Sequence, residues 1–442
     1  MMETGRDRDG PLKDMIVLVI GASGLIGATL CARLAAEGHE VVRAVRSRTS
    51  NGLFQGRTVV IDMAKALEAE VWLPHLHGID AVVNCAGVLQ DSAQENTGNV
   101  HAIGASALFA ACERAGIRRV IHFSAIGVDR EQPSAFSASK LAGDHALMER
   151  DLDWIILRPS VVLGRPAFGA SALFRGLAAL PLLPTMPGTG LLQVVQLDDV
   201  VSTVLILLGR ESPSRLTLEL AGPEALTMSE IVARYREWLG WGRATEFVLP
   251  GWVAAMLYRS GDLAGLLGWR PPMRTNSARE IARGATGALG PWQLATGIQP
   301  STVASALAAS PPTVQERWFA ALYLVKPAAF VVLPFFWIAT GIISLTTGWG
   351  SGVELLLGTA FEALAGPVVV AGALADMVVG AMIAWRATSR AGLWGAIAVS
   401  CFYAIAGSIL RPDLWNAPLG PLMKILPILV LHFCALAILE ER

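Results

Sequence analysis

Charged residues are scarce in this chain, and neither sign is in excess. Asp, Glu, Lys and Arg make up 16% of the 442 residues, and the formal net charge is −1. A protein that binds nucleic acid usually carries a clear excess or patch of Lys and Arg. The charge balance therefore argues against nucleic acid as a partner.

Cysteine and tyrosine are also rare. The five cysteines stand at positions 31, 85, 112, 401 and 434, without Cys-x-x-Cys spacing. Such cysteines indicate neither a zinc site nor a disulfide framework, and they suit a reducing cytoplasm. The four tyrosines stand at positions 235, 258, 323 and 403. The first 234 residues therefore contain no phenol.

The N-terminus lacks the apolar core of a signal peptide, and we expect residues 1–14 to be a polar tail. The shortage of charge is concentrated late in the chain. From Phe319 to Arg442 only six residues are basic and six are acidic. We therefore expect a soluble N-terminal part and membrane entry, if any, in the last part of the chain.

The stretch from Met15 to Gly27 is typical of a strand, a tight turn and the start of a helix. Five apolar residues, Ile16–Ile20, precede glycines at 21, 24 and 27. In dinucleotide-binding loops such glycines allow a sharp turn, close approach of the backbone to a pyrophosphate, and tight helix–strand packing. The phosphates bind at the helix N-terminus. The predicted phosphate-binding residues are Gly21, Ser23, Gly24, Leu25, Ile26 and Gly27. The alternative is a glycine-rich turn without a ligand.

The second expected strand, residues 39–46, ends where a dinucleotide site meets the adenosine ribose. NAD-binding sites place an Asp or Glu there, whereas this chain has Arg46 and Arg48. An arginine accommodates a 2′-phosphate that a carboxylate would repel. The sequence thus favours NADP(H) over NAD(H) as the cofactor. Two solvated arginines are the alternative.

Six segments, in motif order over roughly the first 230 residues, resemble the extended or atypical short-chain dehydrogenase/reductases, which include the epimerase/dehydratase-like proteins. The segments are the glycine loop, Asp62-Met63, Asn84-Cys85-Ala86-Gly87, residues 120–128 around Ser124, Phe136 to Lys140, and residues 157–164. The resemblance implies an α/β fold with a Rossmann-type doubly wound parallel sheet and a small substrate subdomain.

The resemblance also implies roles for residues. Asp62 and Met63 would contact the adenine, and Cys85, Ala86 and Gly87 would line the nicotinamide-ribose side. Lys140 would hold the ribose hydroxyls. Ser124 would steady a carbonyl or hydroxyl of an unidentified small-molecule substrate.

One position departs from the family. Its proton donor is a tyrosine four residues before the lysine, and this chain has Phe136 there. Serines 134, 137 and 139 are nearby, but a serine hydroxyl is a much poorer acid than a phenol. General acid–base assistance typically contributes about 10²- to 10⁴-fold to a rate. Ordinary dehydrogenase chemistry is therefore in doubt.

We expect the NAD(P)-binding domain to span residues 15–230, with substrate-side elements from about 165. The rest of the substrate subdomain and a connector should occupy 231–317. Within this part Thr227 and Glu230 have the spacing of a helix capping box. Residues 247–317 contain no catalytic constellation.

Residues 318–442 are predicted to form an all-α transmembrane domain of four helices. The apolar runs cover about 319–345, 364–385, 391–410 and 419–439, each close to the ~20 residues that cross a bilayer. Residues 351–363 would be a short interfacial piece. Residues 310–326 and the hydropathy that follows resemble the DoxX-like membrane domain. Buried soluble helices are the alternative.

Flanking charges predict the orientation. With the N-terminal domain inside, the cytoplasmic flanks hold Arg317, Arg386, Arg390 and Arg442, and the outer loops hold only Arg411. The dinucleotide domain would then face the cytoplasm, and the lipid bilayer would be a partner.

Of the ionisable residues within the apolar runs, three are expected at a similar depth. Counted from the expected cytoplasmic ends, Lys326, Asp376 and His432 would lie at about equal depth, roughly 10–13 Å at 1.5 Å per residue. We therefore predict a Lys326–Asp376 ion pair with His432 beside it. The alternative is that Lys326 extends to the headgroups while His432 packs as a neutral side chain.

Two functions agree with the sequence. One is a membrane-anchored NADP-dependent oxidoreductase acting on a membrane-soluble carbonyl or quinone. The other is a catalytically degenerate NADPH-binding sensor or assembly subunit. Phe136 favours the second, and Ser124 and Lys140 favour the first.

Overall fold

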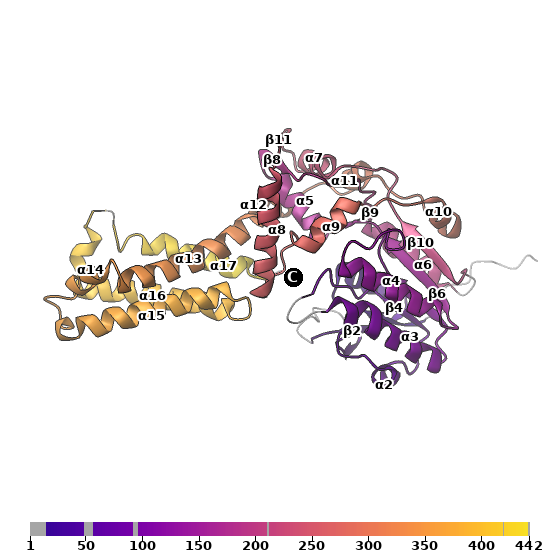
Figure 1. Cartoon of the computed structure of the whole chain (residues 1–442), viewed down its shortest axis with the longest axis horizontal. Coiled ribbons are helices and arrows are strands. Elements are labelled where there is room, and N and C mark those ends of the chain that lie inside the picture. Colours follow the sequence, from indigo (N-terminus) through magenta and orange to yellow (C-terminus); the bar gives the residue numbers. More distant parts are fainter. Residues whose placement is uncertain (1–14, 48–55, 92–95, 210–211, 419, 441–442) are drawn as a thin grey trace, which may run out of the picture. The chain divides into compact units, whose positions relative to one another are not determined.

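The computed structural model describes residues 15–47, 56–91, 96–209, 212–418 and 420–440 (Figure 1). The chain divides into two compact units. The first comprises Met1–Asp262 and Pro271–Arg317, and the second comprises Leu263–Arg270 and Trp318–Arg442. The short segment 263–270 thus belongs to the second unit, although both of its flanks belong to the first.

A seven-stranded parallel sheet forms the centre of the first unit, in the order β10-β6-β5-β4-β1-β2-β3. The strands are β1 (Ile16–Ile20), β2 (Glu40–Val45), β3 (Arg57–Val60), β4 (Ala81–Asn84), β5 (Arg119–Phe123), β6 (Asp153–Pro159) and β10 (Leu216–Leu220). The chain runs outward from β1 to β3 and returns to β4 on the other side of β1. Doubly wound sheets bind ligands at the carboxyl edge of such a switch point. The predicted fold class is confirmed.

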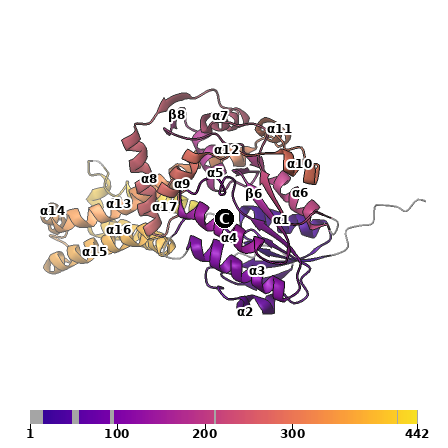
Figure 2. The ribbon, with the colours of Figure 1, turned by 45° about the vertical axis from the view of Figure 1, so that its right-hand side comes forward.

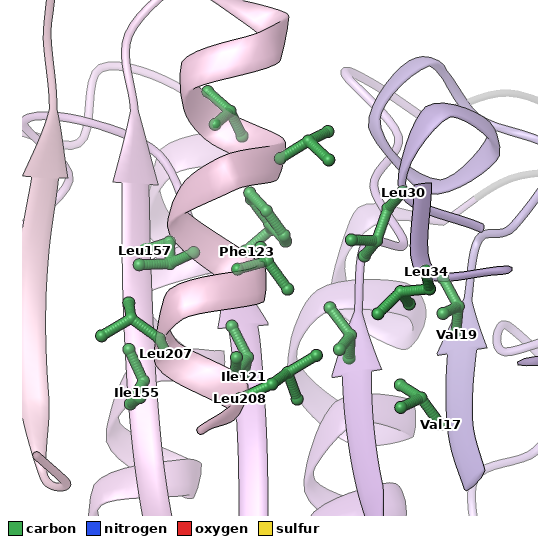
Figure 3. Close-up of a cluster of buried hydrophobic side chains, with 14 of the residues drawn as sticks. Val17, Val19, Leu30, Leu34, Ile121, Phe123, Ile155, Leu157, Leu207 and Leu208 are labelled. Carbon is green, nitrogen blue, oxygen red and sulfur yellow. The ribbon is translucent and has the colours of Figure 1, made fainter. Parts of the chain in front are cut away.

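Helices cover both faces of the sheet, because parallel strands are apolar on both sides. On one face, side chains of β1, β5 and β6 pack against Leu30 and Leu34 of α1 and Leu207 and Leu208 of α6 (Figure 3). On the other face a second apolar cluster includes Trp72, Leu108 and Leu147. Helices α3 and α4 lie side by side on this second face (Figure 2). The helices of these two layers are α1 (Leu25–Ala36), α6 (Leu197–Leu208), α2 (Ala69–Trp72), α3 (Gly104–Arg114) and α4 (Ala135–Met148).

Two short parallel strand pairs and several helices complete the first unit. The pairs are β7 (Val162–Leu163) with β9 (Val195–Gln196), and β8 (Leu182–Thr185) with β11 (Thr245–Val248). The helices are α5 (Gly169–Ala178), α7 (Met228–Trp238), α8 (Gly251–Leu266), α9 (Thr275–Arg283), α10 (Gly290–Thr296) and α11 (Val303–Ala309), and the last four residues of α8 belong to the second unit. The predicted capping box of α7 is confirmed, since Glu230 N donates to Thr227 Oγ1 and Thr227 N donates to Glu230 Oε2.

The second unit is helical (Figure 1). Its elements are α12 (Val314–Tyr323), which begins in the first unit, α13 (Val325–Leu345), α14 (Trp349–Glu354), α15 (Ala365–Ala384), α16 (Ser389–Leu410) and α17 (Ile425–Ile438). Among the described residues, three helical stretches are long and apolar enough to cross a membrane: 325–345, 362–384 and 389–410. The fourth predicted span corresponds to α17, which has 14 residues. It starts late because Gly420, with φ of 54°, and Pro421 precede it in a turn.

The structure does not place Lys326, Asp376 and His432 at one depth along the helices. Because α12 ends at Tyr323 and α13 begins at Val325, Lys326 is the second residue of its span. Its Nζ donates to the carbonyls of Leu439 at 3.3 Å and Glu440 at 3.5 Å.

The other two residues have partners further along the bundle. Tyr403 donates its hydroxyl to Asp376 Oδ1 at 2.8 Å, and Trp337 Nε1 donates to His432 Nε2 at 2.9 Å. Thr340, the other hydrogen-bonding neighbour of Asp376, lies roughly 21 Å along α13 from Lys326 at ~1.5 Å per residue. The predicted Lys326–Asp376 ion pair is therefore wrong. The error came from counting depth from the start of the apolar run instead of the start of the helix.

Candidate dinucleotide-binding site

The glycine loop joins β1 to α1 at the switch point of the sheet. Gly21 has φ of 73°, and a Cβ added there would lie 2.9 Å from Ala86 N. A Cβ on Gly27 would lie 2.3 Å from Gly21 O, so only glycine lets the helix approach the turn this closely. Gly24 is the N-cap of α1, and the part of the chain that the structure describes shows no side-chain cap hydrogen bond at that end. The geometry therefore leaves the first N–H groups of α1 available for a phosphate.

The adenine side is formed after β2 and β3. Asp62 is partly exposed and its Oδ1 accepts the Ala64 N–H at 3.1 Å. Met63 is buried in the apolar cluster under α3, where its carbonyl would lie 2.3 Å from a Cβ on Gly104. Arg46 follows β2 and is exposed. Arg48 lies outside the described residues. The adenine contacts and the role of Arg46 stay predictions.

Lys140 of α4 connects the ends of two strands. Its Nζ donates to Ala86 O at 3.2 Å after β4 and to Phe123 O at 2.7 Å in β5. Burial lowers the pKa of Lys140 to about 8. A Cβ on Gly87 would lie 3.6 Å from this Nζ, so glycine keeps the approach to the ammonium open. The third ammonium hydrogen of Lys140 can meet a ligand hydroxyl.

Cys85 stands beside this lysine between β4 and Ala86. Burial raises the pKa of its thiol well above the ordinary value, so the thiol is neutral and unreactive. We therefore assign Cys85 no chemistry beyond contact.

Phe136 lies one helical turn before Lys140 and packs against His101. The two rings meet edge to face, with centroids 5.5 Å apart. His101 Nε2 accepts the Val88 N–H at 3.0 Å, so its proton is on Nδ1, which lies 2.9 Å from Ser139 Oγ. Ser139 in turn donates to the carbonyl of Phe136 at 2.9 Å. The His101 N–H and the Ser139 hydroxyl hydrogen are therefore both used in hydrogen bonds within the protein. Neither is available as an acid in place of the missing phenol.

His101 was not among the predicted site residues. It lies in a π-helical turn, Asn99–Ile103, before α3. Burial and the neighbouring Lys140 hold the pKa of His101 well below its usual range. Such turns are frequent at functional sites, but they have no sequence signature.

A buried polar network lies beneath Ser124. Arg158 donates to Asp144 Oδ2 through Nε at 3.1 Å, and its Nη1 pairs with Asp129 at 2.5 Å. Burial raises the pKa of Asp144 despite this pairing. Ser124 Oγ is buried beside this carboxylate and makes no hydrogen bond of regular geometry among the described residues. Ser124 Oγ thus keeps hydrogen-bonding capacity, and its role toward a substrate stays a prediction.

His122 completes the network. Asn84 Nδ2 lies 3.2 Å from His122 Nδ1, and His122 Nε2 lies 3.7 Å from Asp144 Oδ1. Burial holds the pKa of His122 well below its usual range, so the ring is neutral. Neither His122 nor Asp144 was predicted, because residues distant in sequence meet here only through the packing of α4 on the sheet.

The four tyrosines have other surroundings. Tyr235 is buried with the Arg175 guanidinium 5.6 Å from its ring, and Tyr258 is half-buried on α8. Tyr323 and Tyr403 belong to the second unit. No contact among the described residues brings a phenol to Lys140 or Phe136.

Two family models match this chain. Residues 21–176 match the NAD(P)H-binding family, and residues 334–433 match the DoxX-like family. Residues 21–176 thus form an NAD(P)H-binding domain, and residues 334–433 form a DoxX-like domain. The predicted short-chain dehydrogenase/reductase resemblance and the DoxX-like resemblance are thereby confirmed. The roles of individual residues in the NAD(P)H-binding domain stay predictions.

Curated relatives match mainly the NAD(P)H-binding domain. An uncharacterized protein of Mycobacterium tuberculosis, Rv2047c, is 27% identical over 219 residues, which are 50% of this chain and 23% of that protein. The epimerase family protein ML0860 of Mycobacterium leprae is 26% identical and covers 58% of this chain and 87% of its own length. The ceramide reductase of Caulobacter vibrioides is 26% identical and covers 43% and 60%. This chain thus spans less than a quarter of the first relative.

Solved structures share the fold. The UDP-glucuronic acid 4-epimerase of Bacillus cereus, in complex with UDP-glucuronic acid and NAD, superposes with a TM-score of 0.52 at 18% identity. The match covers 70% of this chain and all of that one. At this identity the likeness establishes the fold alone.

Proposed function

We propose that this chain is a membrane-anchored, NADP(H)-dependent oxidoreductase that reduces a membrane-soluble quinone. The proposal rests on one observation. The glycine loop, the buried Lys140 and the Ser124 hydroxyl lie together at the carboxyl edge of the sheet, and Phe136 stands where a phenol is expected. The bound nicotinamide would supply a hydride. The protein residues bind and orient it, but they supply no strong acid.

The substrate that accepts the hydride must therefore give an anion that needs no strong acid to protonate it. Hydride transfer to a quinone gives a phenolate-type anion, whose conjugate acid has a pKa near 10, like tyrosine. Hydride transfer to an aliphatic ketone gives an alkoxide. The pKa of its conjugate acid is close to that of water, about 16. The difference of ~6 pKa units corresponds to about 8 kcal/mol in the stability of the anion. A quinone can then take its proton from water.

The residues have separate tasks in this proposal. Lys140 holds the ribose hydroxyls with its remaining hydrogen, and Ser124 donates to one quinone oxygen. His101 and Ser139 fix the turn after Gly87 and the start of α4, since they bond Val88 and Phe136. The cofactor preference for NADP(H) rests on Arg46 and on the absence of Asp and Glu from positions 41–61.

The membrane helices support a substrate that dissolves in lipid. The ceramide reductase among the relatives acts, by its name, on a lipid, which agrees with this class of substrate. Orientation with the NAD(P)H-binding domain in the cytoplasm is part of the proposal. Lys326, Arg386 and Arg390 lie at the span ends joined to that domain, against Arg411 and Lys424 at the opposite ends. Lys424 precedes α17 and therefore counts with the outer end.

A second function is favoured by one specific observation. His101 pairs with Ser139, and Ser139 donates to the Phe136 carbonyl, so neither side chain has a proton to donate to a substrate. Among the described residues, no phenol stands at this position to donate one. The chain could then bind NADPH without turnover and act as a sensor or accessory subunit.

Anaerobic stopped-flow with the full chain in lipid nanodiscs would separate the two functions. NADPH oxidation is followed at constant quinone and, separately, at constant aliphatic ketone. Oxidation with the quinone at least 100-fold faster than with the ketone supports the reductase. Tight NADPH binding by calorimetry with no oxidation by either acceptor supports the binding function and refutes the reductase.

A matched pair of variants checks that the Rossmann site is used. Lys140→Met should abolish oxidation, whereas Arg33→Ala, an exposed change on α1, should leave it unchanged. Equal rates in both variants would refute the assignment of the site.

A further inference from the structure

Helix α8 has an apolar face that none of the described residues covers. Trp252, Met256, Leu263 and Leu266 are 72%, 52%, 61% and 74% exposed. At 100° per residue these four side chains fall within an arc of about 80°. Val248, three residues before the helix, is 70% exposed as well. Single exposed apolar residues are ordinary, but a continuous stripe marks a surface that binds something apolar.

The opposite face of α8 is already packed. Ala254, Gly261 and Gly265 are buried, and a Cβ on Gly261 would lie 1.8 Å from Met273 O. The exposed stripe is therefore a second apolar face of α8, opposite the face that packs on the protein. Both faces are apolar, and only one has a protein partner among the described residues.

The C-terminal end of α8 is fixed to the ends of membrane helices. Arg386 N donates to Leu267 O at 3.0 Å, and Trp269 Nε1 donates to Ala384 O at 2.8 Å. The Trp269 ring also packs on Phe330 near the start of α13, with centroids 4.7 Å apart. Ala384 is the last residue of α15. All of these residues belong to the second unit, so α8 ends at the level where the spans leave the bilayer.

We propose that the outer face of α8, the stripe of Trp252, Met256, Leu263 and Leu266, lies in the headgroup–acyl boundary of a phospholipid bilayer. The occupant is lipid because Leu263 and Leu266 belong to the same unit as the membrane helices, and Leu267 and Trp269, directly after them, bond the end of α15 and the residues that follow it. Tryptophan prefers that boundary, and helices of this kind bury their apolar face a few ångströms into it. Arg259 lies on the same face and can reach the phosphates with its guanidinium.

This placement has a consequence for substrate entry that rests on the proposed function. Asp262 of α8 pairs with Arg274 at 3.4 Å, and Arg274 Nη2 donates to Asp91 O at 3.5 Å. Asp91 follows the Gly87–Val88 turn that borders the nicotinamide side. Asp262 and Arg274 therefore link α8 to the loop after Val88, so a quinone that reaches α8 from the lipid would lie on the helix that contacts this loop.

Photolabelling of the wild-type full chain tests the lipid contact without any turnover. The chain is placed in nanodiscs whose phospholipids carry a diazirine near the glycerol end of one acyl chain. After photolysis, peptide mass spectrometry locates the adducts. We expect adducts on α8 at Trp252, Met256 and Leu263, with a yield within about threefold of that on the exposed span residue Val331. Met148, an exposed apolar residue at the end of α4, is the matched control and should carry none.

Two results would overturn the proposal. One is lipid adducts confined to α13, α15 and α16 with none on α8. The other is crosslinks between two copies of the chain through α8 in place of lipid adducts, which would make the stripe a dimer interface. Because no reaction is measured, failure here is distinct from failure of the proposed oxidoreductase.

Discussion

Replacing Phe136 by tyrosine would put a phenol one helical turn before Lys140. The Lys140 ammonium donates to Ala86 O and Phe123 O and keeps its remaining hydrogen for the ribose, so it would act on the phenol through its positive charge. A neighbouring ammonium lowers the pKa of a phenol and lets it exchange a proton with the substrate. General acid catalysis of this kind contributes about 10²- to 10⁴-fold. We expect Phe136→Tyr to raise NADPH-dependent reduction of an aliphatic ketone by that factor.

The same variant should change quinone reduction by less than about tenfold, because the phenolate-type product needs little help. The gain should also depend on pH. Since burial lowers the pKa of Lys140 to about 8, the ammonium that activates the phenol is lost above that pH. The advantage of Phe136→Tyr should therefore be largest below pH 8 and decline above it.

Stopped-flow at pH 7 and pH 9 with ketone and quinone measures all four rates. Phe168→Tyr adds the same hydroxyl to an exposed phenylalanine before α5 and serves as the control. The reasoning is refuted if Phe136→Tyr binds NADPH as tightly as wild type but reduces the ketone no faster. An equal gain with quinone and ketone would refute the explanation of the acceptor preference.

Three further changes test the cofactor site and its lysine. Arg46→Ala should weaken NADPH binding about tenfold in calorimetry, ~1.4 kcal/mol, while NADH binding stays constant; equal losses would exclude a 2′-phosphate contact. Gly27→Ala places a Cβ 2.3 Å from Gly21 O, so we expect ~1–3 kcal/mol of destabilisation and loss of NADPH binding. Gly242→Ala, where a Cβ would meet nothing within 4 Å, is its control in thermal melts, and similar melting of the two variants would contradict the packing argument. Because folding lowers the pKa of Lys140 to about 8 from 10.5, the unfolded chain binds more protons between those values, so the first unit should gain stability as pH rises through that window. A melting temperature that rises no more steeply in wild type than in Lys140→Met would contradict this.

The glycine loop and the parallel sheet could be predicted because each depends on residues adjacent in sequence. Ile16–Ile20 has the length and branching of a buried strand, and the conformation of Gly21 follows from the sharp turn after it. Thr227 and Glu230 form their capping box within one helical turn. In these cases the local pattern and the final structure agree.

The surroundings of the missing phenol could not be predicted. His101, Ser139 and Val88 lie on different elements, and they meet because a π-helical turn packs against α4. The Asp144–Arg158 pair similarly depends on α4 crossing the end of β6. The depth of Lys326 was wrong for a related reason, because hydropathy does not reveal the break at Leu324 between two apolar helices.

The segment Leu263–Arg270 determines when the chain can complete its assembly during synthesis. Trp269 donates to Ala384 across 115 residues, so its docking partner leaves the ribosome long after it. At ~5–20 residues per second this delay is roughly 6 to 23 s. During that time the indole of Trp269 and the end of α8 have no bundle to join, although the strands of the Rossmann sheet have all been made. The segment Leu263–Arg270 can therefore bind the second unit only after α15 has been made. If the ribosome stalls before residue 384, Trp269 has no Ala384 carbonyl to donate to.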